Sequence, residues 1–387
     1  MKRIYFDHSA TTQVLPEVVE AMIPCYTKFF GNASEPHTLG NEAFELLHKS
    51  REIIAGAINA RPEEIIFTSG GTESDNLAIK GIAESYVKKG NHIITSSIEH
   101  PAVGNTCKYL ERVGYDITYI PVDKNGVVNS KDVENAINSK TTLISIMHAN
   151  NVVGSIQPIE EIGEIAKRRG VIFHTDAVQS FGTLKIDVEK LNVDLLSISS
   201  HKLHGPKGIG ALYKKRGVKV ISQMHGGEHE KGRRAGTENI PGIVGFAKAV
   251  EIAMSEIDEK AKKLKKLREY LVKGVSEGIE DVIYTGHPEN RLPGHASFAI
   301  KYIEGESIVL ALDNKGIAIS SGSACSSIKS EPSHVLLSMG IAPEIAQGSI
   351  RISMGRGNTK EEVDYFLEVL SPIVKRLREM SPLYPGK

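Results

Sequence analysis

Polar and basic side chains follow several apolar runs of the sequence, and their types could together hold a charged cofactor. The run LLSISS (195–200) leads into His201 and Lys202, and the run VIFHTD (171–176) ends on Asp176. A lysine at a strand end could carry a covalent adduct, and burial, which lowers the pKa of an amine, would let it move protons once it is displaced. A carboxylate nearby could keep a ring nitrogen protonated. These residue types therefore indicate covalent catalysis.

Other apolar runs end on residues that could bind the rest of such a cofactor. GGTESDN follows the run at 64–69, where Gly71 and Thr72 offer backbone N–H groups and a hydroxyl at the start of a helical stretch. This arrangement suits a phosphate, although a plain turn with a helix cap would leave the same pattern. His100 and Asn151 follow two further runs. The sequence thus places a possible phosphate site, a flat ring and an amide at neighbouring strand ends.

Together these residues fit pyridoxal 5′-phosphate. This cofactor needs a phosphate cradle, a lysine, an acid beside its ring nitrogen, a flat side chain on its ring and a donor near its phenolic oxygen. The predicted contributors are Thr72, Lys202, Asp176, His100 and Gln179, with Ser199 and His201 as further phosphate ligands. Taken singly, Asp176 could be a satisfied buried carboxylate and His100 a core histidine. Lys202 could be a surface lysine, with Lys207 as its competitor, and Glu73 is the next candidate for the acid.

Seven apolar runs alternate with helix-like stretches between about residues 60 and 215. They are EIIFTS (64–69), HIITSS (92–97), ITYIPV (117–122), TLISIM (142–147), VIFHTD (171–176), LLSISS (195–200) and GALY (210–213). Such alternation predicts a mostly parallel α/β sheet with helices on both faces and a ligand at the carboxyl ends of its strands. An apolar stripe over 250–275 predicts a long helix, whose lysines (KAKKLKKLR) indicate a solvated face.

The length of 387 residues suggests two domains. We expect a large cofactor-binding domain over 16–257 and a smaller α/β domain over 258–387 together with 1–15. Lys+Arg and Asp+Glu number 47 each, so the formal net charge of zero favours neither nucleic acid nor an anionic membrane as a partner. The sequence shows no apolar signal-peptide core at its N-terminus and no apolar run as long as a membrane span, so a cytoplasmic location is expected.

Cys325 lies in SSGSACSS (320–327), a run of small residues that is unsuited to a packed core. This run predicts a mobile loop and favours a reactive thiol, whereas Cys25 and Cys107 are expected to be structural. The three cysteines form neither a disulfide framework nor a zinc motif, so no metal site is predicted. Arg351 offers the planar geometry that a carboxylate needs, although a structural ion pair is the alternative.

Nine motifs, in order, resemble the pyridoxal-phosphate-dependent cysteine desulfurases of the NifS/IscS type, which have the aspartate-aminotransferase-like fold (PLP fold type I). They are YFDHSATT (5–12), GGTESDN (70–76), EHPA (99–102), HANN (148–151), TDAVQ (175–179), SSHKLHGPKGIG (199–210), GRRAGTEN (232–239), SSGSACSS (320–327) and IRISMGR (350–356). The match extends over nearly the whole chain. This sequence departs from the family at Val152, where an acid is common, and in the loop at 31–40. Its C-terminal tail is shorter than the tail that some members use to dock a scaffold partner, so the resemblance implies less about partner recognition than about chemistry.

The resemblance implies a role for each motif residue. Lys202 would bind the cofactor covalently, and Cys325 would be the nucleophile that takes up sulfur. Arg351 and Asn151 would bind the substrate carboxylate. Cofactor contacts are implied for Gly71, Thr72, His100, Asn151, Asp176, Gln179, Ser199, His201 and Lys202 and, from the partner subunit of a homodimer, Thr237. His100, which stacks on the ring, would also belong to the catalytic set.

The implied function is conversion of L-cysteine to L-alanine, with the sulfur held as a persulfide on Cys325. The sulfur would then supply iron–sulfur cluster assembly, through a scaffold protein, or another thio-cofactor pathway. One alternative is another lyase or transaminase of the same fold, such as a selenocysteine lyase. A second is a non-catalytic sulfur carrier. The loop cysteine favours the desulfurase, and the presence of Lys202, Asp176 and His100 argues against a non-catalytic protein.

Overall fold

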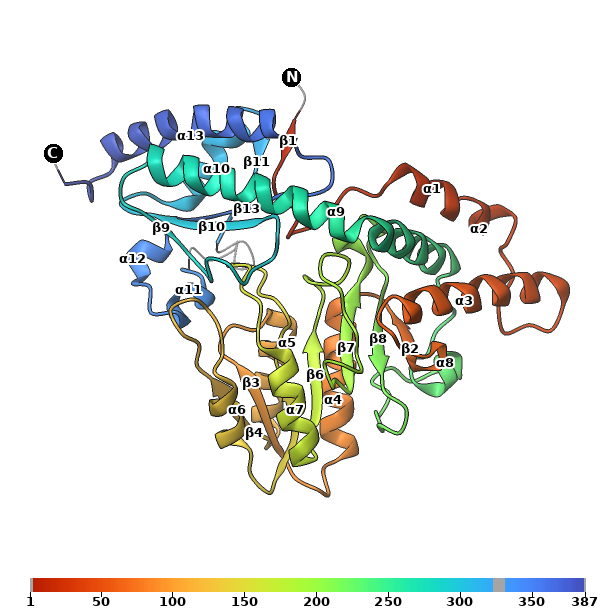
Figure 1. Cartoon of the computed structure of the whole chain (residues 1–387). Helices are drawn as coiled ribbons and strands as arrows, with labels where there is room; N and C mark the ends of the chain where they lie inside the picture. Colours follow the sequence, from red (N-terminus) through yellow and green to blue (C-terminus); the bar gives the residue numbers. More distant parts are fainter. Residues whose placement is uncertain (1–2, 323–330, 386–387) are drawn as a thin grey trace.

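A seven-stranded sheet in the order β2-β8-β7-β6-β5-β3-β4 forms the centre of the larger part of the molecule (Figure 1). The computed structural model describes residues 3–322 and 331–385. The strands are β2 (Ile65–Thr68), β3 (His92–Ser96), β4 (Asp116–Ile120), β5 (Thr141–Ser145), β6 (Ile172–Asp176), β7 (Leu195–Ser199) and β8 (Gly210–Lys214). Each predicted run forms one strand. Within this sheet β8 is antiparallel to both of its neighbours and the other pairs are parallel, which confirms the predicted mostly parallel sheet.

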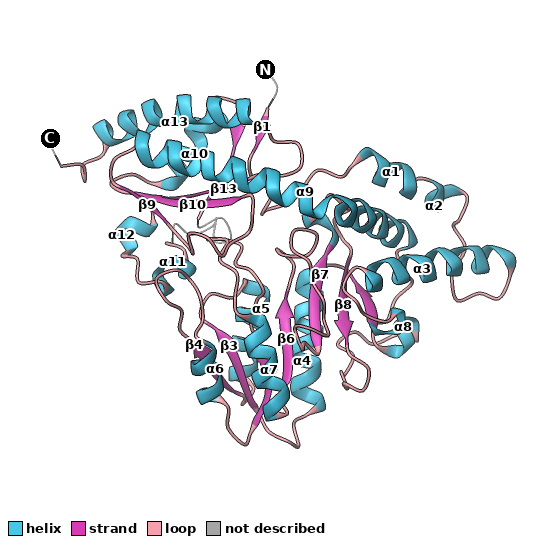
Figure 2. Ribbon diagram, viewed as in Figure 1, coloured by secondary structure: helices cyan, strands magenta, loops and turns pink. Residues whose placement is uncertain are grey.

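Helices cover both faces of this sheet (Figure 2). They include α3 (Thr38–Gly56), α4 (Gly71–Ser85), α5 (Pro101–Arg112), α6 (Ser130–Ala136) and α7 (Ile159–Arg169). Successive side chains of a strand point to opposite faces. Ile93 and Leu195 therefore pack in the apolar cluster of α4 and α5, whereas Ile94 and Leu196 are not in that cluster. Ile144 and Leu196 belong instead to the cluster that contains α3 and α7.

The long helix α9 (Ile240–Gly278) leads from the large sheet into a smaller part of the molecule (Figure 1). That part contains an antiparallel sheet of β9 (Val282–Tyr284), β10 (His295–Ile300), β12 (Ser320–Ser321) and β13 (Ser349–Ser353). Its helices are α10 (Gly305–Asp313), α11 (His334–Ser338), α12 (Pro343–Ala346) and α13 (Lys360–Met380). Strand β1 (Ile4–Tyr5) pairs with β11 (Ile317–Ala318), so the start of the chain packs against this smaller part.

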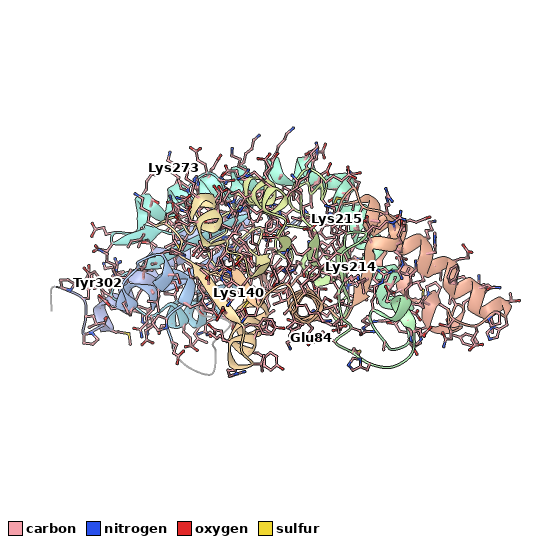
Figure 3. All side chains as sticks on the ribbon, turned by 90° about the horizontal axis from the view of Figure 1, so that it is seen from below. Glu84, Lys140, Lys214, Lys215, Lys273 and Tyr302 are labelled. Carbon is pink, nitrogen blue, oxygen red and sulfur yellow. The ribbon has the colours of Figure 1, made fainter. Side chains whose placement is uncertain are left out.

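Two large apolar clusters meet along α9. Val250 and Ala253 belong to the cluster of the large sheet, whereas Leu264 and Leu271 belong to the cluster that also contains Phe6. The apolar packing of the helix therefore changes between Ala253 and Leu264, and the domain division near residue 257 stays a prediction. In the basic stretch of this helix, Lys262, Lys263, Lys265 and Lys266 are exposed as predicted, whereas Lys260 is half-buried and Arg268 is buried. Lys273, further along the helix, is exposed and points away from the body of the molecule (Figure 3).

Shorter elements complete the larger part of the molecule. They are the helices α1 (Pro16–Met22), α2 (Pro24–Thr27) and α8 (His229–Gly232), and the 3₁₀ turns at Pro62–Glu64 and Ser200–Lys202. Among residues 3–322 and 331–385, no helix has the length and apolar character that a membrane span requires.

Val152, one of the departures from the family pattern, has a structural reason. It is buried and packs with Ile98 and Met147 of the larger part and with Val335 and Leu336 of α11. A carboxylate at this position would lose its hydration and would find no hydrogen-bond or charge partner among these apolar residues, which is unfavourable. Valine instead adds apolar contacts between the two parts of the molecule.

Candidate active site

A cavity of about 310 Å³ lies at the carboxyl ends of the large sheet, between that sheet and β13. It brings together the predicted residues Gly71, Thr72, His100, Asn151, Asp176, Gln179, Ser199, His201, Lys202 and Arg351. Thr237 is not among the residues that line it. Cys325 lies outside the described residues. The strand ends thus meet where the sequence predicted a ligand site.

The turn between β2 and α4 forms a cradle that suits a phosphate. Gly70 has φ of 151°, which favours glycine, and a Cβ at Gly71 would lie 2.7 Å from Cγ2 of Val178. A Cβ at Gly70 would lie 3.8 Å from Oγ of Ser199, so this hydroxyl faces the turn. Because the first N–H groups of a helix lack helical acceptors, the start of α4, with Thr72, can bind an anion here.

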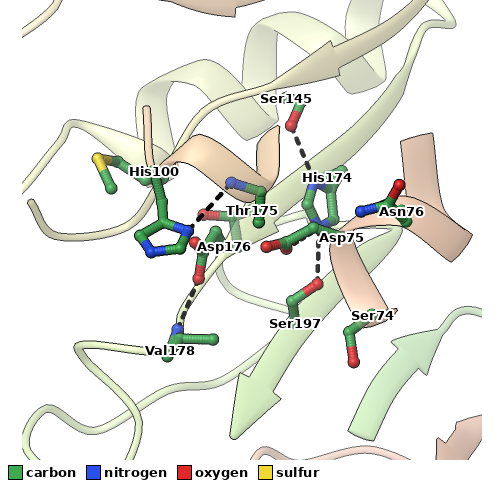
Figure 4. A network of polar contacts seen from close by, with 12 residues as sticks. Ser74, Asp75, Asn76, His100, Ser145, His174, Thr175, Asp176, Val178 and Ser197 are labelled. Carbon is green, nitrogen blue, oxygen red and sulfur yellow. Dashed lines mark hydrogen bonds and ion pairs between the residues drawn. The ribbon is translucent and has the colours of Figure 1, made fainter. Parts of the chain in front are cut away.

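His100 is held in a fixed orientation by the helix that follows it. It is the N-cap of α5, and its Nδ1 accepts a hydrogen bond from the N–H of Ala102 at 3.1 Å (Figure 4). Pro101 occupies the first position of this helix, where its missing N–H has no cost. Burial lowers the pKa of His100, which Asp176 raises and Lys202 lowers further. A neutral ring with Nδ1 as acceptor carries its proton on Nε2.

Asp176 is the last residue of β6 and lies with 6% of its surface exposed. Its Oδ1 accepts a hydrogen bond from the N–H of Val178 at 2.9 Å. Burial raises the pKa of this carboxyl, whereas His100, this N–H group and Lys202 lower it. The carboxyl therefore lies among groups that favour its ionised form, as a partner for a protonated ring nitrogen requires.

Lys202 lies in the same cavity, at the end of the turn that follows β7. Its Nζ donates hydrogen bonds to the carbonyl groups of Ser9 and Ala10. Gln179 also binds this segment, since its Nε2 donates to the carbonyl of Ser9 at 3.0 Å. Lys207, the competing lysine, is exposed and lines a different cavity. The geometry therefore favours Lys202.

Arg351 enters the cavity from β13 and brings a positive charge to its rim. Its Nη2 lies 2.8 Å from Oδ1 of Asp7, and its Nη1 donates to the carbonyl of Asn151 at 3.1 Å. Its Nε is buried without a hydrogen-bond partner. A buried donor without an acceptor is unfavourable, so this N–H group is available to a ligand carboxylate. The structural ion pair that the sequence left open is present, with Asp7.

Two groups at the site were not identified from the sequence, Asp75 and His174. Asp75 lies on α4 and lines the cavity with 1% of its surface exposed. His174 lies on β6, two residues before Asp176, and its Nε2 is 3.6 Å from Oδ1 of Asp75 (Figure 4). The period-two pattern of β6 could have found His174, because residues two apart share a face. No local sequence pattern indicates that Asp75 lies on the buried face of α4 rather than on its exposed face.

The alternative acid Glu73 forms its hydrogen bond and its ion pair outside the cavity. Its Oε2 accepts from the N–H of Ser69 at 2.7 Å, and its Oε1 lies 2.9 Å from Nε of Arg234. Glu73 does not line the cavity, whereas Asp75 does. If a second acid acts near the cofactor ring, Asp75 rather than Glu73 has the required position.

The residues present fit pyridoxal 5′-phosphate. The cradle at Gly71 leaves no room for a Cβ, the hydroxyl of Ser199 faces it, and Asp176 lies among groups that favour its anion. His201 adds a neutral ring, because burial and two lysines lower its pKa to about 4. An amine, Lys202, completes the set. These are the groups that a phosphorylated pyridine aldehyde needs.

This fold and cavity define an enzyme of the aspartate-aminotransferase-like fold, and the comparisons with known proteins place it more closely. The model of the aminotransferase class-V family matches residues 4–366, so the chain belongs to that family. Cysteine desulfurase IscS of Methanosarcina thermophila is 54% identical over 384 residues, which cover 99% of this chain and 95% of that protein. The resemblance that the nine motifs indicated is confirmed: within class V, the chain belongs to the cysteine desulfurases of the NifS/IscS type.

Solved structures agree with this assignment. A NifS-like protein has 43% sequence identity and a TM-score of 0.91, and the alignment covers 97% of this chain and all of that one, 100%. A structure of SspA in complex with cysteine has 38% identity and a TM-score of 0.81, and covers 91% of this chain and 99% of that one.

Proposed function

We propose that this chain is a cysteine desulfurase that uses pyridoxal 5′-phosphate to convert L-cysteine to L-alanine and holds the sulfur as a persulfide on Cys325. The observation that carries this proposal is the cavity that joins the cradle at Gly71, the acid Asp176, the amine Lys202 and the guanidinium of Arg351. Family membership and the cysteine complex of a relative support it. Among described residues, no group of three His, Cys, Asp or Glu side chains could hold a metal.

Each residue of the cavity has a task in this reaction. The bound cofactor supplies an electron sink for the carbanion at the substrate Cα. Asp176 keeps the ring nitrogen protonated, and His100, fixed as a helix cap, stacks on the ring. Lys202 attaches the cofactor and, once the substrate has replaced it, moves a proton at the substrate Cα. Arg351 orients the substrate carboxylate through its unpaired Nε–H group.

Cys325 is the proposed nucleophile, and the other two cysteines have properties unsuited to that role. Cys25 and Cys107 are buried with 5% and 0% of their surface exposed. Burial raises the pKa of both thiols, that of Cys107 to about 12. Because the thiolate is the nucleophile, neither would attack sulfur at neutral pH. Ser320 of β12, five residues before Cys325 in the sequence, pairs with Arg351.

The test is the fate of sulfur in the Cys325→Ala variant. Wild-type protein incubated with L-cysteine should release alanine and carry one added sulfur on the peptide that contains Cys325, as measured by mass spectrometry. Cys325→Ala should still change the visible absorbance of the cofactor when L-cysteine is added, because that step needs Lys202, yet it should hold no persulfide. Added sulfur on Cys25 or Cys107 would contradict the assignment, and absence of alanine in the wild type would contradict the function.

The acceptor of the sulfur is proposed to be an iron–sulfur scaffold protein, and the location cytoplasmic. Relatives named as IscS support the first proposal. The same mass-spectrometry experiment tests the proposed acceptor. When a scaffold protein is added, the extra mass of the sulfur should move from Cys325 to a cysteine of that protein. Persistence of the persulfide on Cys325 would instead indicate another acceptor.

We also propose a homodimer in which Thr237 reaches the phosphate of the partner's cofactor. Thr237 and Thr72 are both exposed in the single chain. The segment before Thr237 is anchored by two ion pairs, Arg234 with Glu73 at 2.9 Å and Arg51 with Glu230 at 2.6 Å. Helices α1 to α3 and the segments that connect them expose the large apolar side chains of Val19, Ile23, Tyr26, Phe30 and Phe44. A second chain would cover both features.

Mixed dimers test this proposal. Lys202→Ala inactivates both sites of its own dimer, and Thr237→Glu should do the same by placing a carboxylate against the phosphate. In a tagged heterodimer of the two variants, a shared site combines Lys202 of one chain with Thr237 of the other. One cavity then contains both substitutions, and the other cavity contains neither. About half of the wild-type activity should then return. No activity in a confirmed heterodimer would show that each chain supplies its own Thr237.

A further inference from the structure

Three buried carboxyl groups interact electrostatically: Asp75 and Asp176, which line the cavity, and Glu99, which does not. Their exposed fractions are 1%, 3% and 6%. Burial is the main cause that raises the pKa of Asp75 and of Glu99, and the negative charge of Asp176 raises both further. The pKa of Glu99 reaches about 8. Because like charges in a dry environment disfavour ionisation, the three groups will not all be anions at neutral pH.

The hydrogen bonds show which carboxyl holds the charge. Burial raises the pKa of Asp176 as well, but this carboxyl accepts an N–H group and has two basic neighbours, His100 and Lys202, which lower its pKa. Oε1 of Glu99 accepts hydrogen bonds from Ser96 and from the N–H of Met147. A hydrogen bond with Ser197 lowers the pKa of Asp75, but among the described residues no positive charge lowers the pKa of either carboxyl. Oδ1 of Asp75 and Oε2 of Glu99 are buried without hydrogen-bond partners. An ionised oxygen without a donor is costly in a protein interior, and a protonated carboxyl avoids most of that cost. The negative charge therefore belongs to Asp176.

His174 does not supply a positive charge to Asp75. It is fully buried, and its two ring nitrogens lie 2.8 Å from Oγ of Ser145 and 3.0 Å from Oγ of Ser197 (Figure 4). Burial lowers the pKa of His174 to about 3, so the ring is neutral. The contact of 3.6 Å between His174 and Asp75 is consequently no ion pair at neutral pH.

We propose that Asp75 is a positioning residue: it stays a neutral carboxylic acid beside the cavity and so leaves Asp176 as the carboxyl that is ionised. The proposal rests on the proposed function, since Asp176 matters as the partner of the cofactor ring. An anion at Asp75 would repel the charge of Asp176 and favour its protonation. The titratable groups around Asp75 are His174 and Asp176 on β6 and Glu99 after β3, with His100 and Lys202 across the cavity.

Asp75→Asn tests this protonation state through the pH dependence of unfolding. Asp75 of the folded wild type keeps a proton that the unfolded chain releases above its usual pKa of 3.8. Wild-type stability therefore falls as pH rises from that value toward the higher folded-state pKa, and the asparagine variant lacks this loss. The ratio of the unfolding constants, wild type over variant, should rise by about tenfold per pH unit in that window. A ratio that is constant or falls would overturn the proposal.

The experiment uses the full-length holoprotein in denaturant, with the same excess of pyridoxal 5′-phosphate throughout. Glu99→Gln is the matched control and should show the same slope between the usual pKa of 4.5 and about 8. The visible band of the cofactor in Asp75→Asn should keep the wild-type pH profile, because Asp176 stays ionised; a shifted profile would contradict the proposal. If the protein failed to turn over L-cysteine, the proposed function would be wrong, and the unfolding slope would still decide the state of Asp75.

A second measurement covers the case in which Asp75→Asn does not fold. Infrared spectra of wild-type protein with isotopically labelled aspartate should show the carbonyl band of a protonated aspartic acid at neutral pH. Absence of this band would overturn the proposal. Asp75→Glu keeps an acid at this position but carries no labelled aspartate there, so it should lack the band; persistence of the band would assign the proton to another aspartate and would overturn the proposal as well.

Discussion

Lys202→Ala is expected to lose all turnover of L-cysteine and the visible absorption of the covalently attached cofactor. Lys202 is the lysine whose Nζ lies in the cavity with Asp176 and the cradle at Gly71. Its contacts with the carbonyl groups of Ser9 and Ala10 hold the amine in the cavity. Covalent attachment and proton transfer at the substrate both depend on this amine, so its removal affects two steps.

Lys207→Ala and Lys202→Arg are the matched controls. Lys207 is exposed and lines another cavity, so its alanine variant should keep nearly wild-type turnover and absorption. Lys202→Arg retains the positive charge but cannot form the covalent bond, and we expect it to be as inactive as Lys202→Ala. Absorption spectra and alanine release measure all three variants. Activity in Lys202→Ala, or its loss in Lys207→Ala, would show that the amine has been assigned to the wrong residue.

Residues at strand ends could be predicted from the sequence because the rule that governs them is local. The runs that became β6 and β7 were recognisable by their apolar residues, and parallel packing brings Asp176 and Lys202 to one edge of the sheet. The order of the strands was harder. The antiparallel insertion of β8 between β2 and β7 follows from chain paths that no local pattern records.

Other features of the site depend on contacts between distant parts of the chain. Arg351 was predicted as a carboxylate ligand, but its contact with Asp7 joins residues on β13 and next to β1. Asp75 belongs to the GGTESDN motif, whose glycines and threonine predict a phosphate turn, and its position beside His174 arises because α4 packs over β6. Such contacts are set by tertiary packing, so the propensities and periodicities of single segments do not reveal them.

Asp176→Ala is expected to lower turnover by several orders of magnitude and to weaken cofactor binding. Without this carboxylate the ring nitrogen loses its proton and the ring becomes a poorer electron sink for the carbanion. A loss of about a thousandfold corresponds to ~4 kcal/mol of transition-state stabilisation. Asp176→Asn, which keeps the shape but not the charge, should be impaired nearly as much, whereas Asp176→Glu should recover part of the activity. Rates of alanine release and cofactor titrations measure both effects.

Near-normal turnover in Asp176→Ala would mean that another acid serves the ring nitrogen. Asp75 is then the group to test, because it lines the cavity, whereas Glu73 is held by Arg234 and Ser69. Loss of the charge at Asp176 also removes one of the causes that raise the pKa of Asp75, so Asp75 would ionise more readily. Combining Asp75→Asn with Asp176→Ala separates the possibilities. If the double variant is inactive while Asp176→Ala is active, Asp75 has taken over the charge; if both are active, neither carboxylate is required.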